Sequence, residues 1–303
     1  MPLIPAWLAL DGETRAALPA LWEGLVDEPS VMASVTEDLT LPAGSRILSF
    51  AVAMSVGNAL VDELQLDAAP QPQVVRRVYR ALLDGRHTPM TEREIGLASA
   101  NADLRLLGMH FDMVSHDFSE RLAQSLVVMG AESFRIGLSG YNLRAFYFEN
   151  SQANEVWTLT TGFRQRPHAS PAPQTASPGD RLSYFRVTRE EAVVNVPGSS
   201  IGHIFDHHPP LFRLSSSQRR LLWLSLFDDN DDALEERLGV SMHGLKKLWR
   251  GIYERVQDQQ PDFFGDAADD DDGKRGREKR RQVLAYVRQR PEELRPWVAV
   301  AGR

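Results

Sequence analysis

The sequence predicts a mixed domain of helices and strands, α+β or α/β in class, over residues 1–211, followed by a smaller all-helical domain. Helical and alternating apolar patterns are interleaved before residue 212. A loop-prone segment at 197–210, rich in Pro, Gly and His, separates them from a stretch with helical periodicity alone. A chain of 303 residues is long enough for one large domain and one small one.

Composition excludes several classes of protein. With 43% hydrophobic and 25% charged residues the chain is ordinary for a globular protein, and its net charge of -7 argues against coating nucleic acid along its whole surface. The absence of cysteine excludes disulfides, thiolate zinc sites and cysteine nucleophiles, and fits a reducing compartment. Residues 1–10 lack the basic start of a signal peptide, and the apolar run at 47–61 is too short and too interrupted to span a bilayer. We therefore expect a cytoplasmic protein with no membrane partner.

The first domain is expected to combine five helices with four strands. Apolar spacing and one Thr-x-x-Glu capping pattern predict helices over 14–25, 45–64, 74–83, 91–98 and 117–130. Runs rich in β-branched and aromatic residues predict strands over 104–114, 141–149, 156–164 and 182–187, the second and third forming a hairpin. The Pro-, Ser- and Ala-rich stretch 166–180 reads as a loop.

Residues 214–256 predict three helices joined by tight turns. Ser215, Asp231 and Ser241 each stand where a helix can begin, because their side chains can accept hydrogen bonds from free N–H groups of a first turn. Gly239 follows the last apolar position of the second helix, and glycine readily adopts the left-handed conformation that ends a helix. This order predicts a helix-turn-helix.

The third of these helices has two distinct sides. One stripe at three- to four-residue spacing is apolar and is expected to pack inward: Leu245, Leu248, Ile252 and Val256. Other positions on the helix carry polar or cationic side chains that can reach phosphates and base edges in a major groove: His243, Lys246, Lys247 and Arg250. These four residues are the predicted DNA contacts.

The residues of this segment resemble the LuxR/GerE DNA-binding domain. The resemblance covers 214–256 and rests on Leu214-Ser215, on Arg237-Leu238-Gly239-Val240-Ser241, and on Leu245-Lys246 followed by Ile252, spaced without a gap. It implies that the third helix reads double-stranded DNA, with contacts around Lys246, and that a further helix pairs two copies into a homodimer. It also implies a bacterial transcription regulator whose first domain is a sensor or a dimerisation module.

The segment departs from that family in ways that leave a second interpretation open. Gln218 stands where the family usually has Glu, Gly244 replaces a usual Thr at about 1 kcal/mol of helix propensity, and Gly251 is a second weak point. Four acids also crowd the start of the second helix, where they would repel phosphate or simply complement the helix dipole: Asp228, Asp229, Asp231 and Asp232. The alternative is a degenerate helix-turn-helix that works through protein–protein interaction.

Residues 261–303 are expected to form an acidic-then-basic linker and a C-terminal helix. Acids between 266 and 272 are followed at once by a basic run at 274–281. This helix either adds phosphate contacts or presents a solvated face while three apolar residues pack inward, and the second reading is favoured: Val283, Leu284 and Val287.

Other candidate sites carry weaker signals. No phosphate loop, dinucleotide fingerprint, nucleophile elbow or zinc-protease motif is present, so neither an enzyme activity nor a cofactor is predicted. One polar cluster has metal-ligand spacing but reads as a linker: His203, Asp206, His207 and His208.

Aromatic residues of the first domain can line a pocket for a small-molecule effector, with Arg135 or Arg144 as polar anchor: Phe111, Phe134, Tyr141, Phe146, Tyr147, Phe148 and Trp157. The other option is a protein effector.

Overall fold

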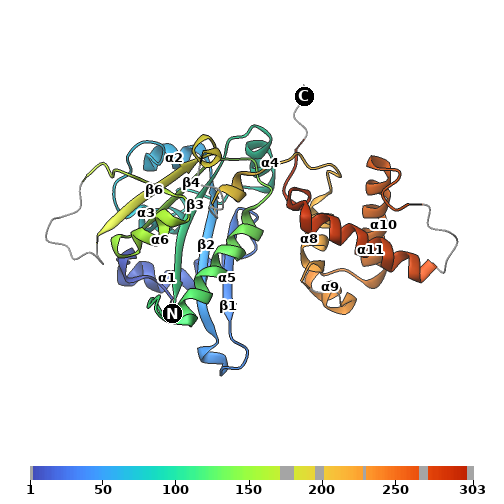
Figure 1. Cartoon of the computed structure of the whole chain (residues 1–303), viewed down its shortest axis with the longest axis horizontal. Helices are drawn as coiled ribbons and strands as arrows, with labels where there is room; N and C mark the ends of the chain where they lie inside the picture. The colour runs from blue at the N-terminus through green and yellow to red at the C-terminus, as the bar shows by residue number, and fades with distance from the viewer. Residues whose placement is uncertain (1–2, 171–180, 195–200, 228–229, 266–271, 299–303) are drawn as a thin grey trace. The chain divides into compact units, whose positions relative to one another are not determined.

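A computed structural model describes residues 3–170, 181–194, 201–227, 230–265 and 272–298 (Figure 1). The chain divides into two compact units, Met1–Asp206 and His207–Arg303. The sequence placed this division a few residues later, at 211/212. In class the molecule is α+β. Among the described residues, no helix is both long enough and apolar enough to cross a membrane.

The first unit is organised around a six-stranded sheet in the order β1-β2-β3-β4-β6-β5. Its strands are β1 (Val31–Glu37), β2 (Ile47–Val56), β3 (Leu104–Met113), β4 (Leu143–Ser151), β5 (Arg164–Arg166) and β6 (Leu182–Thr188). Only β3 and β4 pair in parallel, and their pairing sets Leu106 beside Phe146. All other neighbours are antiparallel.

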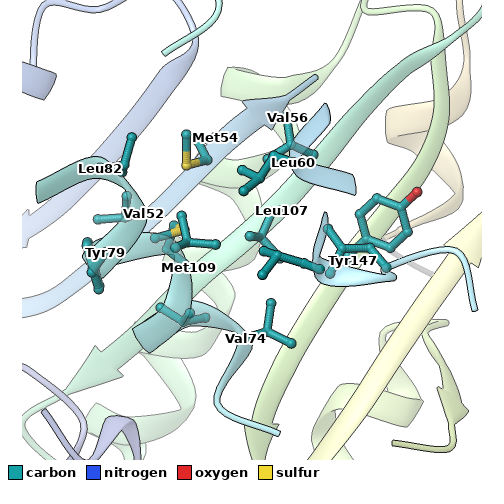
Figure 2. Close-up of a cluster of buried hydrophobic side chains, with 14 of the residues drawn as sticks. Val52, Met54, Val56, Leu60, Val74, Tyr79, Leu82, Leu107, Met109 and Tyr147 are labelled. Atoms are coloured by element: carbon teal, nitrogen blue, oxygen red, sulfur yellow. The ribbon is translucent and has the colours of Figure 1, made fainter. Parts of the chain in front are cut away.

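Three helices build the core against one face of this sheet: α1 (Gly12–Leu25), α2 (Asn58–Leu64) and α3 (Val74–Leu83). Figure 2 shows Val52, Met54 and Val56, alternate residues of β2, in one buried cluster with Leu60 of α2 and Val74 of α3. Alternation along a strand sends every second side chain to the same face, so Ala53 belongs to the opposite cluster. Burial of such side chains contributes about 1.5–3 kcal/mol each.

The opposite face is covered by α4 (Glu92–Ala100), α5 (Arg121–Leu138) and the 3-10 helix η4 (Gly202–Phe205). Thr91 and Glu94 form the predicted capping box at the start of α4. The unit also contains two short α-helices, α6 (Glu155–Thr160) and α7 (Arg189–Val193), and the 3-10 helices η1 (Ala6–Leu8), η2 (Ala43–Ser45) and η3 (Gln152–Asn154). The helices expected at 74–83 and 91–98 and the strands expected at 104–114 and 182–187 are therefore confirmed.

The helix expected at 45–64 is wrong over its first half. Residues Ile47–Val56 form β2, a central strand buried along its second half, and only Asn58–Leu64 is helical. A strand covered on both faces needs apolar residues at successive positions, so its sequence lacks the alternation that marks a half-exposed strand. Strand β1, at the sheet edge, was not predicted.

The hairpin expected from 141–149 and 156–164 is also wrong. The first segment is β4, but Glu155–Thr160 is helix α6, and β4 pairs with β6 instead. The chain turns directly after β4, where the Ser151 side chain accepts a hydrogen bond from Ala153 N–H and Asn150 bonds Thr158. These local side-chain bonds outweigh the strand preference of Val156 and its neighbours.

In the second unit the described elements are helical: α8 (Ser216–Ser225), α9 (Asp231–Leu238), α10 (Met242–Gln259), α11 (Asp272–Gln289) and the 3-10 helix η5 (Pro291–Leu294). A single apolar cluster joins them. Val283, Leu284 and Val287 of α11 are buried in it, which confirms the inward packing expected of these three residues. Residues 283–294, expected within a linker and terminal helix, thus share the core of α8–α10.

Candidate nucleic-acid interface

The turn between α9 and α10 follows the sequence prediction. Gly239 adopts φ 64, ψ 33, the left-handed conformation, and ends α9. Ser241 begins α10, its hydroxyl accepting a hydrogen bond from Gly244 N–H at 3.3 Å. A residue other than Gly, Asn or Asp at position 239 would be strained there, because other L-residues rarely adopt positive φ.

Helices α8, α9 and α10 contact one another through the buried side of α10. Leu245, Ile252 and Val256 are at most 1% exposed, as the apolar stripe predicted, whereas Leu248 is half-buried. Trp249, which was not assigned to the stripe, is 6% exposed and belongs to the core. Its position, four residues from Leu245 and three from Ile252, is the signal that could have revealed it.

The opposite side of α10 carries all four predicted contacts. His243, Lys246, Lys247 and Arg250 are exposed. At about 100° per residue, they fall within one arc of about 100° on the helix, facing away from the buried stripe. Within the described part of the chain, none of these four side chains forms an ion pair.

The acidic start of α9 is partly neutralised by a cation of the same unit. Asp231 forms an ion pair with Arg280 of α11, with a distance of 2.6 Å between Oδ1 and Nη1. Asp232 is exposed in the first turn of the same helix, and Asn230 rather than an acid caps that turn. Asp228 and Asp229 lie outside the described residues. At least one of the four acids expected to repel DNA phosphate, Asp231, is therefore already balanced by a cation.

Two departures from the family pattern meet in space. A Cβ at Gly251 would lie 3.1 Å from Nε2 of Gln218, tighter than ordinary van der Waals contact. Gln218 closes a capping box on α8, its Oε1 accepting from Ser215 N–H at 2.9 Å. The glycine of α10 thus leaves room for the glutamine cap of α8. Gly244 has a similar role, since a Cβ there would lie 3.3 Å from Cβ of Val240 in the turn.

Several other cations of the second unit have internal partners. Arg255 of α10 donates from Nε to the carbonyl oxygen of Phe212 at 2.9 Å. In α11, Arg280 lies 4.7 Å from the ring centroid of Trp249, and Lys279 lies 4.7 Å from that of Phe264. Arg281 pairs with Glu278 on its own helix at 2.9 Å. The contacts of Arg255, Arg280 and Lys279 stabilise the fold, whereas the pair of Arg281 lies on the surface.

A buried carboxylate that the sequence did not reveal links the two ends of the second unit. Glu293 in η5 is 1% exposed and accepts hydrogen bonds from the backbone N–H groups of Leu211 and Phe212, at 2.7 and 3.0 Å. Burial raises the pKa of this carboxyl, although the two backbone N–H groups oppose the shift. The bond ties the last helical turn of the chain to the beginning of the unit, a contact between residues too distant in sequence for any local pattern.

The residues predicted for a ligand pocket and for a metal site do not all come together in the structure. Five of the seven predicted aromatics line one cavity of the first unit, together with Arg135: Phe111, Phe134, Phe146, Phe148 and Trp157. Tyr141 and Tyr147 belong to the cores instead, and Arg144 pairs with Asp103. His203 lies in η4, which ends at Phe205, so it shares no helical face with His207. Among the described residues, no group of three or more acidic, His or Cys side chains is arranged to hold a metal ion.

Comparison with models of known protein families gave no match, and searches among curated proteins and among solved structures likewise found no significant similarity.

Proposed function

We propose that this protein is a DNA-binding transcription regulator whose second unit docks α10 in the major groove. The observation that carries the proposal is the exposed basic face of that helix: Lys246, Lys247 and Arg250, with His243, present unpaired cations and donors opposite a buried stripe. Guanidinium and ammonium groups on the first turns of a helix are the usual means of contacting phosphates and base edges.

The geometry of the turn supports this reading. A left-handed glycine between α9 and α10 and a serine cap at the start of α10 hold the N-terminal turns of that helix at the surface. Those are the turns that enter the groove in helix-turn-helix proteins. The resemblance of residues 214–256 to the LuxR/GerE domain, noted from the sequence, points the same way.

We further propose that the protein acts as a homodimer on a palindromic site. A single basic face with few cations, in a unit that also carries the exposed Asp232, binds DNA weakly by itself. Pairing two copies doubles the contacts and matches a two-fold symmetric site. The first unit then serves as the module that responds to an effector, a small molecule or a protein, and biases the pairing.

Retention of pooled genomic DNA fragments by the purified full chain at two salt concentrations, with sequencing of the retained fraction, tests the proposal. We expect enrichment of fragments that share a palindrome, with weaker retention at the higher salt because released counterions drive binding.

Uniform or undetectable retention at both salt concentrations would contradict DNA binding. It would favour the alternative of a degenerate helix-turn-helix that docks on another protein, to be tested by the partners that co-purify with the chain. The acids around Asp232 are the feature that favours this second function.

A further inference from the structure

The cavity between the sheet and its covering helices in the first unit is walled by aromatic rings. Its lining includes Phe111 of β3, Phe146 and Phe148 of β4, Phe134 of α5 and Trp157 of α6, and Phe163 packs against the two rings of β4. The rings contact one another, with centroids 6.1 Å apart for Phe111 and Trp157 and 5.7 Å apart for Phe148 and Phe163. The first pair packs edge to face and the second is tilted, and such contacts between rings fix the shape of the wall.

Small residues keep this space open. A Cβ at Gly130 of α5 would lie 2.9 Å from Cε2 of Phe111, and a Cβ at Gly108 of β3 would lie 2.7 Å from Cδ2 of Phe148. Both rings therefore lie directly against backbone. Ala131, next to Gly130, also lines the cavity. Larger side chains at these positions would displace the rings or fill the space, so the sequence preserves a hollow that close packing would otherwise remove.

The polar groups at the rim are already satisfied. The guanidinium of Arg135 bonds both oxygens of Glu132 on the same helix, with Nε 2.8 Å from Oε2. The hydroxyl of Thr161 donates to the carbonyl oxygen of Thr158 at 2.7 Å. Charge at the rim is thus balanced, and a charged ligand would leave its own charge unpaired among aromatic rings, which is costly.

Size limits the occupant. The cavity volume is about 100 Å³, somewhat below the ~150 Å³ of an apolar cavity that holds benzene. Phe111, Phe134 and Trp157 are half-buried rather than fully buried, so the cavity can be reached from solvent. An apolar group of about one ring fits if the wall relaxes slightly, while the rest of a larger molecule stays outside.

We propose that this cavity binds a small neutral molecule that inserts an aromatic ring or a short hydrocarbon group between β3, β4, α5 and α6. Binding is driven by burial of apolar surface against the rings of Phe111, Phe148 and Trp157. The inference stands on the first unit alone and does not depend on DNA binding by the second.

Toluene is the probe for this site, and its binding to the full chain can be measured by ligand-observed NMR titration. Ala131→Phe adds a ring inside the cavity. Val128→Phe adds the same ring to the same helix at a position that is 68% exposed and does not line the cavity. We expect saturable toluene binding by the wild type and by Val128→Phe, and binding at least about tenfold weaker in Ala131→Phe.

Benzoate, the charged counterpart of toluene, should bind more weakly than toluene because its carboxylate finds no free cation. Ala131→Leu, a smaller intrusion, replaces Ala131→Phe if thermal unfolding shows that the larger variant is not folded. The proposal is overturned if the wild type shows no saturable binding, if a folded Ala131 variant binds toluene as the wild type does, or if benzoate binds as tightly as toluene.

Discussion

Helices α10 and α11 of the second unit are both cationic, yet their cations have different surroundings. The basic run that begins α11 is the denser of the two in sequence. Nevertheless Arg280 is held by Asp231 and Trp249, Lys279 lies over Phe264, and Arg281 pairs with Glu278. The N-terminal half of α10 has fewer cations, but they are exposed and, in the described part of the chain, without ion-pair partners.

The difference teaches that the density of basic residues does not by itself assign a cation to binding, because part of the denser run is held by partners within the protein. Exposure alone does not distinguish the helices either, since Arg277 and Arg288 of α11 are exposed as well. A cation that already balances a carboxylate gains less from contact with a phosphate, because its charge is partly compensated. An exposed and unpaired cation is not compensated in this way, and contact with phosphate releases counterions. This comparison makes predictions for each kind of group.

The largest expected effect concerns His110 in the first unit. Unlike His243 of α10, which is exposed, His110 is buried. His110 of β3 is fully buried against Trp22, Phe50 and Tyr79, and burial lowers its pKa to about 4. Between pH 6.5 and pH 4, His110 is protonated in the unfolded chain but not in the folded chain. This group therefore costs the first unit about 2–3 kcal/mol as the pH falls from 7 to 4.5.

His110→Phe should remove that acid-side loss. Urea unfolding of the wild type and the variant at pH 7 and pH 4.5 measures it. Equal pH dependence of the free energy of unfolding in both proteins would mean that burial does not hold this imidazole uncharged.

The next effect concerns Arg280, the internally paired cation of α11. Arg280→Ala should lower the free energy of unfolding of the second unit by about 1–2 kcal/mol, because both the ion pair to the partly exposed Asp231 and the contact with Trp249 are lost. Arg277→Ala, at an exposed position of the same helix, is the matched control and should change it by less than about 0.5 kcal/mol. Thermal unfolding of the two variants compares them, and equal losses would contradict the assignment of Arg280 to the fold.

The smallest effect concerns Asp232, the exposed acid in the first turn of α9. Asp232→Asn should tighten binding to a retained DNA fragment by about threefold, because it removes repulsion of phosphate. Asp258→Asn makes the same charge change in the last turn of α10 and is the control. Because Asp258 lies about 16 Å along the helix axis from Lys247, beyond the screening length of ~8 Å, this variant should leave the affinity for DNA unchanged. A titration in which both variants gain equally would point to net charge rather than position.

Prediction from sequence succeeded where a local pattern determines the structure. The caps Thr91, Ser215 and Ser241 and the left-handed Gly239 were all readable, because capping depends on residues three or four apart. The exposed position of Lys246 and its neighbours followed from helical periodicity, as did the inward packing of Val283.

Features that depend on contacts distant in sequence escaped prediction. The buried strand β2 was taken for a helix because both of its faces are covered, and only the whole sheet shows this. The pairing of Asp231 with Arg280 and the anchoring of Phe212 by Glu293 join residues far apart along the chain. The aromatics of the cavity were named from composition, but only the fold separates Phe148, which lines it, from Tyr147, which lies in the opposite core.

The most direct test of the central claim, that α10 rather than α11 contacts DNA, is the salt dependence of affinity for a retained fragment. Replacing Lys246, Lys247 and Arg250 together by Ala should weaken binding about 100-fold or more and reduce the salt slope by roughly 2–3, at ~0.9 per phosphate contact. Replacing Arg277, Arg281 and Arg288 of α11 together by Ala should weaken it less than about fivefold. Equal or greater loss in the α11 variant, or unchanged binding in the α10 variant, would contradict the account.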